Sequence, residues 1–231
     1  MKNILITGAT SGIGKVTAEI LSKENKVFLT GRRKLNLENY FSCDLTDINQ
    51  INLLFEEAKN YFNGGIDVLI NCAGQYIYKS IEDMTLADIN YLTNLDFIAP
   101  YMLSKLVIPD MKQNKWGRIV NIGSISGIVG EASATMYSAC KAGLSGLVKS
   151  LALEVAQYDI TVNQINPGWV DTPLVNVLSE DEKREVIDVT PQKRFVEPIE
   201  IAKLVEYLIS DSAKGITGQN INVCAGLTIG C

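Results

Sequence analysis

Short runs of β-branched and apolar residues alternate along this chain with longer segments whose apolar residues recur at helical spacing. The short runs predict strands, and the longer segments predict helices between most of them. Strands that are apolar throughout and separated by helices are typical of a parallel sheet covered on both faces. We therefore predict an α/β fold with a doubly wound, seven-stranded parallel sheet. The predicted strands are Asn3–Thr7, Lys26–Thr30, Tyr40–Cys43, Asp67–Asn71, Arg118–Ile122, Thr161–Ile165 and Gln219–Val223.

The chain has the size and composition of one well-filled domain, residues 1–231. It is 47% hydrophobic and 20% charged, which supplies enough apolar material for a single core. The longest helices are predicted at about Leu95–Gln113 and Tyr137–Tyr158. The most irregular stretch, Gly168–Pro198, lies between the last two predicted strands. Long loops in compact domains are commonly functional, so we expect this stretch to form a lid over a substrate.

A glycine-rich turn follows the first predicted strand. Residues Thr7–Gly14 read Thr-Gly-Ala-Thr-Ser-Gly-Ile-Gly, and Lys15–Lys23 after them has helical spacing. Glycines let the backbone turn tightly and approach a phosphate, whose charge then meets the amides and dipole of the following helix. An ordinary strand-to-helix turn can also contain glycines. The strand before and the helix after favour a dinucleotide pyrophosphate site.

Ser124, Tyr137 and Lys141 are the clearest candidates for catalysis. Tyr137 and Lys141 are four residues apart on one predicted helix, so their side chains lie on the same face. Ser124 follows a predicted buried strand, thirteen residues before Tyr137. A phenol has an ordinary pKa of about 10, and a nearby ammonium lowers that pKa. We therefore expect Tyr137 to act as an acid–base, with Ser124 supplying a second hydroxyl.

A second Tyr-x-x-x-Lys pattern, at Tyr101 and Lys105, shows that this spacing alone is weak evidence. Tyr101 lies in a segment rich in Leu, Ile and Met, where a tyrosine usually packs against its neighbours. Tyr137 differs because a serine at the end of a predicted strand lies upstream. Tyr101 therefore serves as an internal comparison for Tyr137.

The chain contains no histidine, which removes several alternative chemistries. Ser-His-Asp and Cys-His hydrolases are excluded, as are zinc sites built on histidine ligands. The five cysteines include no Cys-x-x-Cys pair, so they predict neither a thiolate metal site nor a disulfide framework. We expect a site without a metal.

Net charge and the first residues bear on partners and location. A net charge of −5 at pH 7 argues against general binding to nucleic acid or to anionic membranes. The start, MKNILITGATSGIGK, has an apolar run too short for a signal peptide or a membrane span. We expect a soluble, cytoplasmic protein that binds no nucleic acid and no membrane.

Further motifs accompany the glycine-rich turn and the Tyr137–Lys141 pair. They are Asp44 in CDLTD, Asn71-Cys72-Ala73-Gly74, Asn94 in TNL, Ser124 in IVNIGS, Pro167-Gly168 in NPGWVDTP, and Ile216-Thr217-Gly218-Gln219. In this order the motifs resemble the short-chain dehydrogenases/reductases, in the single-domain branch with TGxxxGxG spacing. The resemblance runs nearly from end to end, and it is closest to the bacterial 3-oxoacyl-carrier-protein reductases of fatty acid biosynthesis.

The resemblance implies a Rossmann-type fold and a catalytic tetrad of Asn94, Ser124, Tyr137 and Lys141. In the family, Tyr137 would transfer a proton, Lys141 would tune it and hold the nicotinamide ribose, and Ser124 would steady the carbonyl oxygen. Asn94 would hold a water that links Lys141 to solvent. The reaction would transfer a hydride between nicotinamide and a carbonyl or secondary alcohol.

The end of the second predicted strand bears on the choice of cofactor. Enzymes that bind NAD commonly place an acid there for the ribose 2′-hydroxyl, whereas this chain has Arg32 and Arg33. We therefore predict preference for NADP(H), with NAD(H) as the alternative; the arginines could also be a solvated basic turn. The expected cofactor contacts are Gly8, Thr10, Ser11, Gly12, Ile13, Gly14, Arg32, Arg33, Asp44, Leu45, Asn71, Ala73, Gly74, Tyr137, Lys141, Pro167, Gly168, Val170 and Thr172.

Two positions depart from the family pattern. Cys72 stands where relatives have the second asparagine of Asn-Asn-Ala-Gly, and Cys224-Ala225-Gly226 stands where they often have Asp-Gly-Gly. The first change removes a polar side chain near the expected cofactor site. Neither change falls on the tetrad.

Three functions are compatible with these residues. The first is an NADP(H)-dependent carbonyl reductase of 3-oxoacyl thioesters, for which an acyl carrier protein would be a partner. The second is an NAD-linked dehydrogenase of a sugar, polyol or other secondary alcohol. The third is a non-catalytic, nucleotide-sensing regulatory protein, against which the complete tetrad argues. Two groups of residues bear on the first function: apolar lid residues that could cover an acyl chain (Trp169, Leu174, Val175, Leu178) and a candidate basic landing site for the carrier protein (Lys112, Lys115, Arg118).

The two longest predicted helices also bear on assembly. Both are apolar over more of their circumference than a one-sided surface helix requires, as in LSKLVIPDM and GLSGLVKSLALEV. In the resembling family these helices pair across subunit interfaces. We therefore expect a homotetramer.

Overall fold

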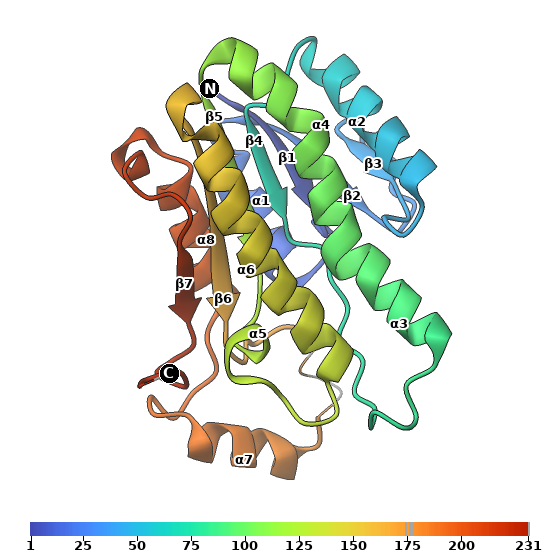
Figure 1. Ribbon diagram of the computed structural model, residues 1–231, viewed down its shortest axis with the longest axis vertical. Coiled ribbons are helices and arrows are strands. Elements are labelled where there is room, and N and C mark those ends of the chain that lie inside the picture. Colours follow the sequence, from blue (N-terminus) through green and yellow to red (C-terminus); the bar gives the residue numbers. More distant parts are fainter. Residues whose placement is uncertain (174, 176–177, 231) are drawn as a thin grey trace.

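One parallel sheet of seven strands forms the centre of the molecule (Figure 1). The structure is a computed structural model that describes residues 1–173, 175 and 178–230. The strands are β1 (Asn3–Thr7), β2 (Lys26–Gly31), β3 (Tyr40–Ser42), β4 (Val68–Asn71), β5 (Gly117–Ile122), β6 (Ile160–Pro167) and β7 (Asn220–Val223). Their order is β3-β2-β1-β4-β5-β6-β7, so the chain winds outward from β1 in both directions. The predicted doubly wound sheet is confirmed, and every predicted strand is present within two residues of its predicted ends.

Helices connect the strands and cover both faces of the sheet. The α-helices are α1 (Gly12–Leu21), α2 (Ile48–Phe62), α3 (Leu86–Thr93), α4 (Ala99–Asn114), α5 (Ser126–Val129), α6 (Thr135–Val155), α7 (Glu180–Val189) and α8 (Pro198–Leu208). A π-helical turn, η1 (Asn94–Ile98), joins α3 to α4, and 3-10 turns form at η2 (Ala156–Tyr158) and η4 (Asp211–Ala213). In the part of the chain that the structure describes, no helix combines the length and the apolar character needed to cross a membrane.

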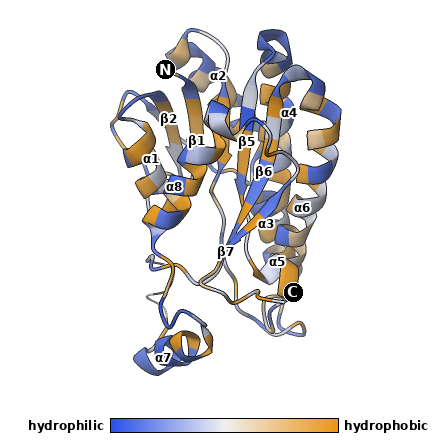
Figure 2. Cartoon of the chain, turned by 90° about the vertical axis from the view of Figure 1, so that its left-hand side faces the viewer, coloured by the Kyte–Doolittle hydropathy of each residue, from blue (hydrophilic) through white to orange (hydrophobic). Residues whose placement is uncertain are grey.

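Neighbouring residues of a strand point to opposite faces of the sheet and contribute to two different hydrophobic cores. In β1, Leu5 packs into the core with residues of α2, α4 and α6, whereas Ile4 and Ile6 pack with residues of α1 and α8. Figure 2 shows these two helical layers on either side of the sheet. Because both faces are buried, the strands are apolar throughout, which is the pattern that the sequence displays.

Three predicted helices have different bounds. The helix expected at Lys15–Lys23 begins at Gly12, directly after an extended Ser11, and ends at Leu21. The helix expected at Leu95–Gln113 is divided into η1 and α4. The helix expected at Tyr137–Tyr158 is α6 followed by η2, and it begins two residues earlier. The early start of α1 leaves the amides of its first turn free to face a ligand.

The stretch Gly168–Pro198 is less irregular than its composition suggests, because it contains α7. Ser179 begins this helix with a capping box: its hydroxyl accepts a hydrogen bond from the amide of Glu182, and the Glu182 side chain accepts from Ser179. Three acids in the first turn complement the positive end of the helix dipole. In Figure 2 this helix lies beyond the ends of the strands, apart from the two helical layers.

The basic landing site expected at Lys112, Lys115 and Arg118 is wrong. Arg118 is fully buried, its guanidinium carbon lies 4.3 Å from the centre of the Trp116 ring, and it donates a 2.6 Å hydrogen bond to the Asp159 carbonyl. It also lies at the amino-terminal end of β5, whereas the pocket described below opens at the carboxyl ends of the strands. Arg118 is a structural residue of the opposite edge.

Candidate active site

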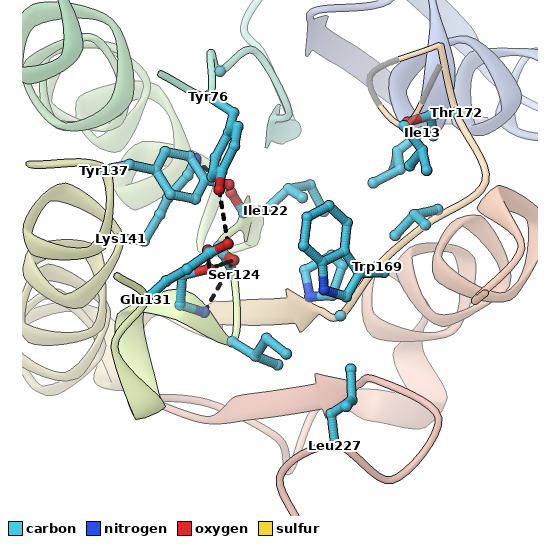
Figure 3. Close-up of a pocket in the computed structure, with 18 of the residues that line it drawn as sticks. Ile13, Tyr76, Ile122, Ser124, Glu131, Tyr137, Lys141, Trp169, Thr172 and Leu227 are labelled. Carbon is cyan, nitrogen blue, oxygen red and sulfur yellow. Dashed lines mark hydrogen bonds between the residues drawn. The ribbon is translucent and has the colours of Figure 1, made fainter. Parts of the chain in front are cut away.

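A pocket of about 370 Å³ opens at the carboxyl ends of β4, β5 and β6 (Figure 3). Ligands of open parallel sheets bind at this edge, near the point where the strand order reverses. The glycine-rich turn, the segment after β4, α5, α6 and the stretch after β6 all contribute to the wall. Most of the exposed wall is apolar, and the polar groups gather on one side, around Ser124 and Tyr137.

Ser124, Tyr137 and Lys141 are brought together in this pocket. Ser124 follows β5 by two residues, and Tyr137 and Lys141 lie one turn apart near the start of α6. The Lys141 ammonium is 5.5 Å from the centre of the Tyr137 ring, and it donates a 3.2 Å hydrogen bond to the carbonyl of Ile122. The spatial arrangement is the one that the i, i+4 spacing predicts.

Asp96 is a neighbour of Lys141 that the sequence analysis did not identify. Its carboxylate is fully buried on η1, and Oδ1 lies 2.9 Å from the Lys141 ammonium. The other oxygen, Oδ2, accepts a 3.2 Å hydrogen bond from the backbone amide of Gln75. Burial alone would lower the pKa of Lys141, but Asp96 and Tyr137 together more than offset this, so the pKa is raised. Lys141 is therefore held charged.

The pKa of Tyr137 differs from the expected direction. Burial raises the pKa of this phenol, and the opposing effect of the Lys141 ammonium is smaller. The Asp96 and Glu131 carboxylates raise the pKa further, while a hydrogen bond with Ser124 lowers it. The expectation that Lys141 brings the pKa of Tyr137 below its ordinary value is wrong for this structure, because burial of the phenol outweighs the effect of the ammonium and Asp96 adds to the effect of burial.

Asn94, the fourth expected member of the tetrad, is the first residue of η1. It is half-buried, and its carbonyl accepts the amide of Ala99 in the wide turn of the π-helix. Such turns often occur at functional sites. Among the described residues Asn94 forms no hydrogen bond with Lys141, whereas Asp96 on the same turn forms an ion pair with it. The water-holding role of Asn94 stays a prediction.

A chain of hydrogen bonds crosses the polar side of the pocket. The Ser124 and Ser126 hydroxyls are 2.9 Å apart, and the Ser126 hydroxyl donates to Glu131 Oε2 at 2.7 Å. The Tyr76 hydroxyl donates to Glu131 Oε1 at 2.7 Å, and the Tyr76 ring packs edge-on against Tyr137, 5.2 Å between centres. Figure 3 shows this chain reaching from Ser124 to Tyr76.

The glycine-rich turn has the shape that a pyrophosphate requires. Gly8 has a φ of +68°, and a Cβ there would lie 2.8 Å from backbone atoms of Ala73. A Cβ on Gly14 would lie 2.3 Å from the carbonyl oxygen of Gly8. Both positions therefore exclude larger residues. We call the turn Thr7–Gly14 the glycine cradle; the first turn of α1 supplies it with backbone amides that have no partner within the helix. Thr10, Ser11, Gly12 and Ile13 lie in this turn as expected, and Ile13 lines the pocket.

The expected contacts on the adenosine side lie around β2 and β3. Arg32 and Arg33 are exposed after β2, and Arg32 donates a 2.9 Å hydrogen bond to the hydroxyl of Tyr91. Asp44 is exposed after β3, and one of its oxygens accepts from the amide and hydroxyl of Thr46. Leu45 differs, because its side chain is buried in the core with α2.

Two further groups of expected cofactor residues lie closer to the pocket. The Asn71 side chain is buried and donates a 2.8 Å hydrogen bond to Asn121, so it links β4 to β5. Gly74 lies beside Asp96 and Lys141 and lines the pocket, and Ala73 donates its amide to the Thr7 hydroxyl. The last residue of β6 and the stretch after it also line the pocket, with Pro167, Gly168, Trp169, Val170, Thr172, Val175 and Leu178. Leu174, also expected over an acyl chain, lies outside the described residues.

The sequence contains weak signals for the residues that were missed. Asp96 is an acid within the apolar stretch LTNLDFIAPYML, and an acid in such surroundings requires a buried partner. Ser126 and Glu131 follow Ser124 within one short segment that ends before α6. The segment after β4 that carries Tyr76 has no periodic pattern, so its entry into the pocket depends on tertiary structure alone.

Comparison with known proteins agrees with this geometry. A family model described as enoyl-(acyl carrier protein) reductase matches residues 8–228. The 3-oxoacyl-(acyl-carrier-protein) reductase of Haemophilus influenzae is 38% identical over 240 residues, covering 98% of this chain and 98% of its own. That of Buchnera aphidicola is 37% identical over 238 residues, covering 98% of this chain and 97% of its own.

A solved structure is similar over its whole length. It is a 4-hydroxyisoleucine dehydrogenase complexed with NADH, with a TM-score of 0.92, 29% sequence identity and full coverage of both chains. Its fold, like the present one, is compatible with a dinucleotide at the carboxyl edge of the sheet. The chain therefore belongs to the short-chain dehydrogenase/reductase family and is an NAD(P)-dependent oxidoreductase that acts on CH–OH groups.

Proposed function

We propose that this protein is an NADPH-dependent reductase of 3-oxoacyl thioesters. The observation that carries the proposal is the pocket, in which the Ser124 and Tyr137 hydroxyls stand at the end of a wall of Ile122, Trp169 and Leu178. Such a wall can cover an acyl chain while the two hydroxyls meet a carbonyl oxygen. The similarity to proteins named 3-oxoacyl-(acyl-carrier-protein) reductases, over nearly the full length of each, supports the same substrate.

The residues of the pocket have separate roles in the reaction. When bound in the glycine cradle, the nicotinamide cofactor supplies the hydride. The Tyr137 hydroxyl donates its proton to the carbonyl oxygen, where negative charge develops, and a hydroxyl beside it stabilises that charge. Lys141, held charged by Asp96, lies beside the Tyr137 ring and beside Gly74, where it orients the phenol and would hold a ribose hydroxyl of the cofactor. Trp169 and Leu178 exclude water from the reacting atoms.

The proposal is tested by a panel of carbonyl and alcohol substrates with each cofactor, followed by the absorbance of the reduced nicotinamide. We expect kcat/KM with an acetoacetyl thioester and NADPH to exceed kcat/KM with simple ketones, sugars and steroids. A sugar or polyol with a far higher kcat/KM would replace the proposed substrate. Cofactor binding without turnover of any substrate would favour a regulatory protein.

A second candidate function is an NAD-linked dehydrogenase of a small polar alcohol, and the rim of the pocket favours it. Leu178 lines the pocket, and α7 begins two residues later with Glu180, Asp181 and Glu182. The basic Lys183 and Arg184 that follow are each paired with one of these acids. An acidic carrier protein would meet like charge at this rim, whereas a small substrate would not.

Arg32 supports the proposed preference for NADPH over NADH. Its exposed guanidinium at the end of β2 is available for the 2′-phosphate, and charge-assisted hydrogen bonds of this kind are worth roughly 1.5–3 kcal/mol. We expect Arg32→Ala to lose about ten- to a hundredfold in NADPH affinity and little in NADH affinity, with Arg33→Ala having the smaller effect. Fluorescence titration with both cofactors checks this. Lys34→Ala, which removes an exposed charge nearby, is the matched control, and equal wild-type affinities would refute the preference.

We also propose a homotetramer, in which α4 and α6 pack against their counterparts. Leu153 on α6 is 85% exposed. Tyr101 is exposed in the first turn of α4, and Ile98 is exposed just before that helix. Exposed apolar side chains on two neighbouring helices are typical of a subunit interface. We expect a tetrameric mass by light scattering at micromolar concentration. A monomeric mass would contradict the proposal.

A further inference from the structure

Glu131 places a carboxylate in the wall of the active-site pocket. It lies in the short segment between α5 and α6, it is half-buried, and it lines the same cavity as Ser124 and Tyr137 (Figure 3). Each of its oxygens accepts one hydrogen bond at 2.7 Å, from Tyr76 and from Ser126. A carboxylate can accept about four hydrogen bonds, so acceptor capacity remains on the pocket side.

The Glu131 carboxylate fixes the direction of the hydrogen bonds that lead to Ser124. A carboxylate only accepts, and a serine hydroxyl has one proton to donate. Because Ser126 gives its proton to Glu131, the 2.9 Å contact between the two serine hydroxyls must be donated by Ser124. Ser124 additionally accepts the backbone amide of Ser126 at 3.1 Å.

This direction has a consequence for the reaction. With its proton given to Ser126, Ser124 has none for a substrate carbonyl oxygen. In this state Ser124 can only accept further hydrogen bonds, so it cannot stabilise the developing oxyanion. If Ser124 turns its proton to a carbonyl oxygen, the 2.9 Å contact between the serine oxygens keeps a hydrogen bond only when Ser126 turns its own proton from Glu131 toward Ser124. That change leaves Glu131 Oε2 without its donor, so it is favoured when another donor takes the place of Ser126.

The surroundings of Glu131 limit where that other donor can come from. The pocket wall also holds the polar side chains of Gln75, Tyr137, Lys141 and Thr172, but among the described residues only Tyr76 and Ser126 donate to the Glu131 carboxylate, and the rest of the wall is mainly apolar, as at Ile122 and Leu227. A charged group that faces an apolar pocket is costly once water is displaced, unless the incoming molecule offers a donor. A site of this kind favours a ligand with an N–H or O–H group and rejects the analogue without it.

We propose that Glu131 is a specificity-determining residue that accepts a hydrogen bond from an N–H or O–H group of the substrate, and that this contact frees Ser124 to donate to the carbonyl oxygen. The inference rests on the proposed carbonyl-reductase function and narrows its substrate class. Two sources of the donor fit. One is an amide N–H in the thiol arm of a 3-oxoacyl thioester, and the other is a hydroxyl beside the reacting carbonyl.

Binding of matched substrate pairs tests the proposal. The first pair is the acetoacetyl thioester of N-acetylcysteamine, which has an amide N–H, and the acetoacetyl thioester of butanethiol, which has none. The second pair is 1-hydroxy-2-butanone and 2-butanone. Dissociation constants are measured by calorimetry with protein saturated with NADP⁺, which cannot reduce a ketone, and kcat/KM is then measured with NADPH. The proteins are the wild type, Glu131→Gln, Ser126→Ala and the control Glu185→Gln, which removes an exposed acid of α7.

We expect the wild type and Glu185→Gln to bind the donor-bearing member of at least one pair about ten- to a hundredfold more tightly. Which pair shows the preference identifies the source of the donor. In Glu131→Gln the preference should fall to within about threefold, because the amide can donate to Ser126 and no longer attracts a donor by its charge. Ser126→Ala should keep the binding preference and reduce the donor-free member faster than the wild type does. In this variant Ser124 no longer donates its proton to residue 126 and can donate it to the carbonyl oxygen.

Equal wild-type affinities within both pairs would overturn the proposal, as would a preference that Glu131→Gln leaves unchanged. If Glu131→Gln fails to fold, as judged by thermal unfolding, two results still test the proposal. They are the ratio of the wild-type dissociation constants within each pair and the turnover of the donor-free member by Ser126→Ala. Because the affinities are measured without turnover, failure of this inference is distinct from failure of the proposed function, which would appear as no reduction of any ketone.

Discussion

Tyr137→Phe is expected to lower kcat for carbonyl reduction by roughly 100- to 10,000-fold, which is the usual contribution of a positioned acid–base. The phenylalanine ring keeps the edge-on packing against Tyr76 but has no proton to transfer. NADPH affinity should change little, because the glycine cradle and Arg32 are intact. Steady-state kinetics and a fluorescence titration of NADPH on the same sample check both statements.

Tyr101→Phe is the matched control for this variant. Tyr101 belongs to the second Tyr-x-x-x-Lys pattern, but it is 48% exposed on α4 and does not line the pocket. Its replacement should leave the chemical step unchanged. Near-normal turnover by Tyr137→Phe, or an equal loss in both variants, would remove Tyr137 from the role of acid.

Asp96→Asn is expected to move the pH dependence of alcohol oxidation. In this direction Tyr137 must be ionised to accept a proton, so the rate rises with pH through the pKa of the phenol. The Asp96 carboxylate raises that pKa, and the neutral amide should therefore lower it. We expect the rising limb of the kcat/KM profile to shift to lower pH by about one unit, the order of effect of one nearby charge.

The same substitution should cost stability, because it leaves the buried Lys141 ammonium without its carboxylate. Breaking a buried ion pair by removing one partner costs about 3–5 kcal/mol. Urea unfolding measures this loss, and the pH profile is recorded where the variant remains folded. Asp188→Asn, which removes an exposed acid of α7, should alter neither quantity. An unchanged pH limb in a folded Asp96→Asn protein would show that Asp96 does not tune Tyr137.

The sheet could be predicted from the sequence because both of its faces are buried. Continuous apolar runs such as ILIT in β1 and VLIN in β4 have few alternatives to a parallel strand between helical layers. Helix bounds were less accurate, since they depend on local backbone conformation. The π-helical turn Asn94–Ile98 lies inside a stretch whose composition predicts one continuous helix, and the start of α1 at Gly12 lies within glycines that have little helical preference.

The site was predictable where its residues share one element and less so where it is assembled from several. Tyr137 and Lys141 lie on one helix, so their spacing in the sequence is also their spacing in the molecule. Asp96 reaches Lys141 from another helix, and Glu131 meets Tyr76 across 55 residues of sequence. The charge around Tyr137, and hence the direction of its pKa, depends on those long-range contacts.

Transfer of an isotopic label tests most directly the claim that this protein reduces a carbonyl with the hydride of NADPH. The wild type is incubated with an acetoacetyl thioester and NADPH deuterated at C4 of the nicotinamide, in separate reactions for the two faces of the ring, and the product is analysed by mass spectrometry. We predict a 3-hydroxyacyl thioester that carries one deuterium at C3 with one of the two labelled cofactors and none with the other. A product without deuterium from either cofactor, or no product while NADPH binds, would contradict the account.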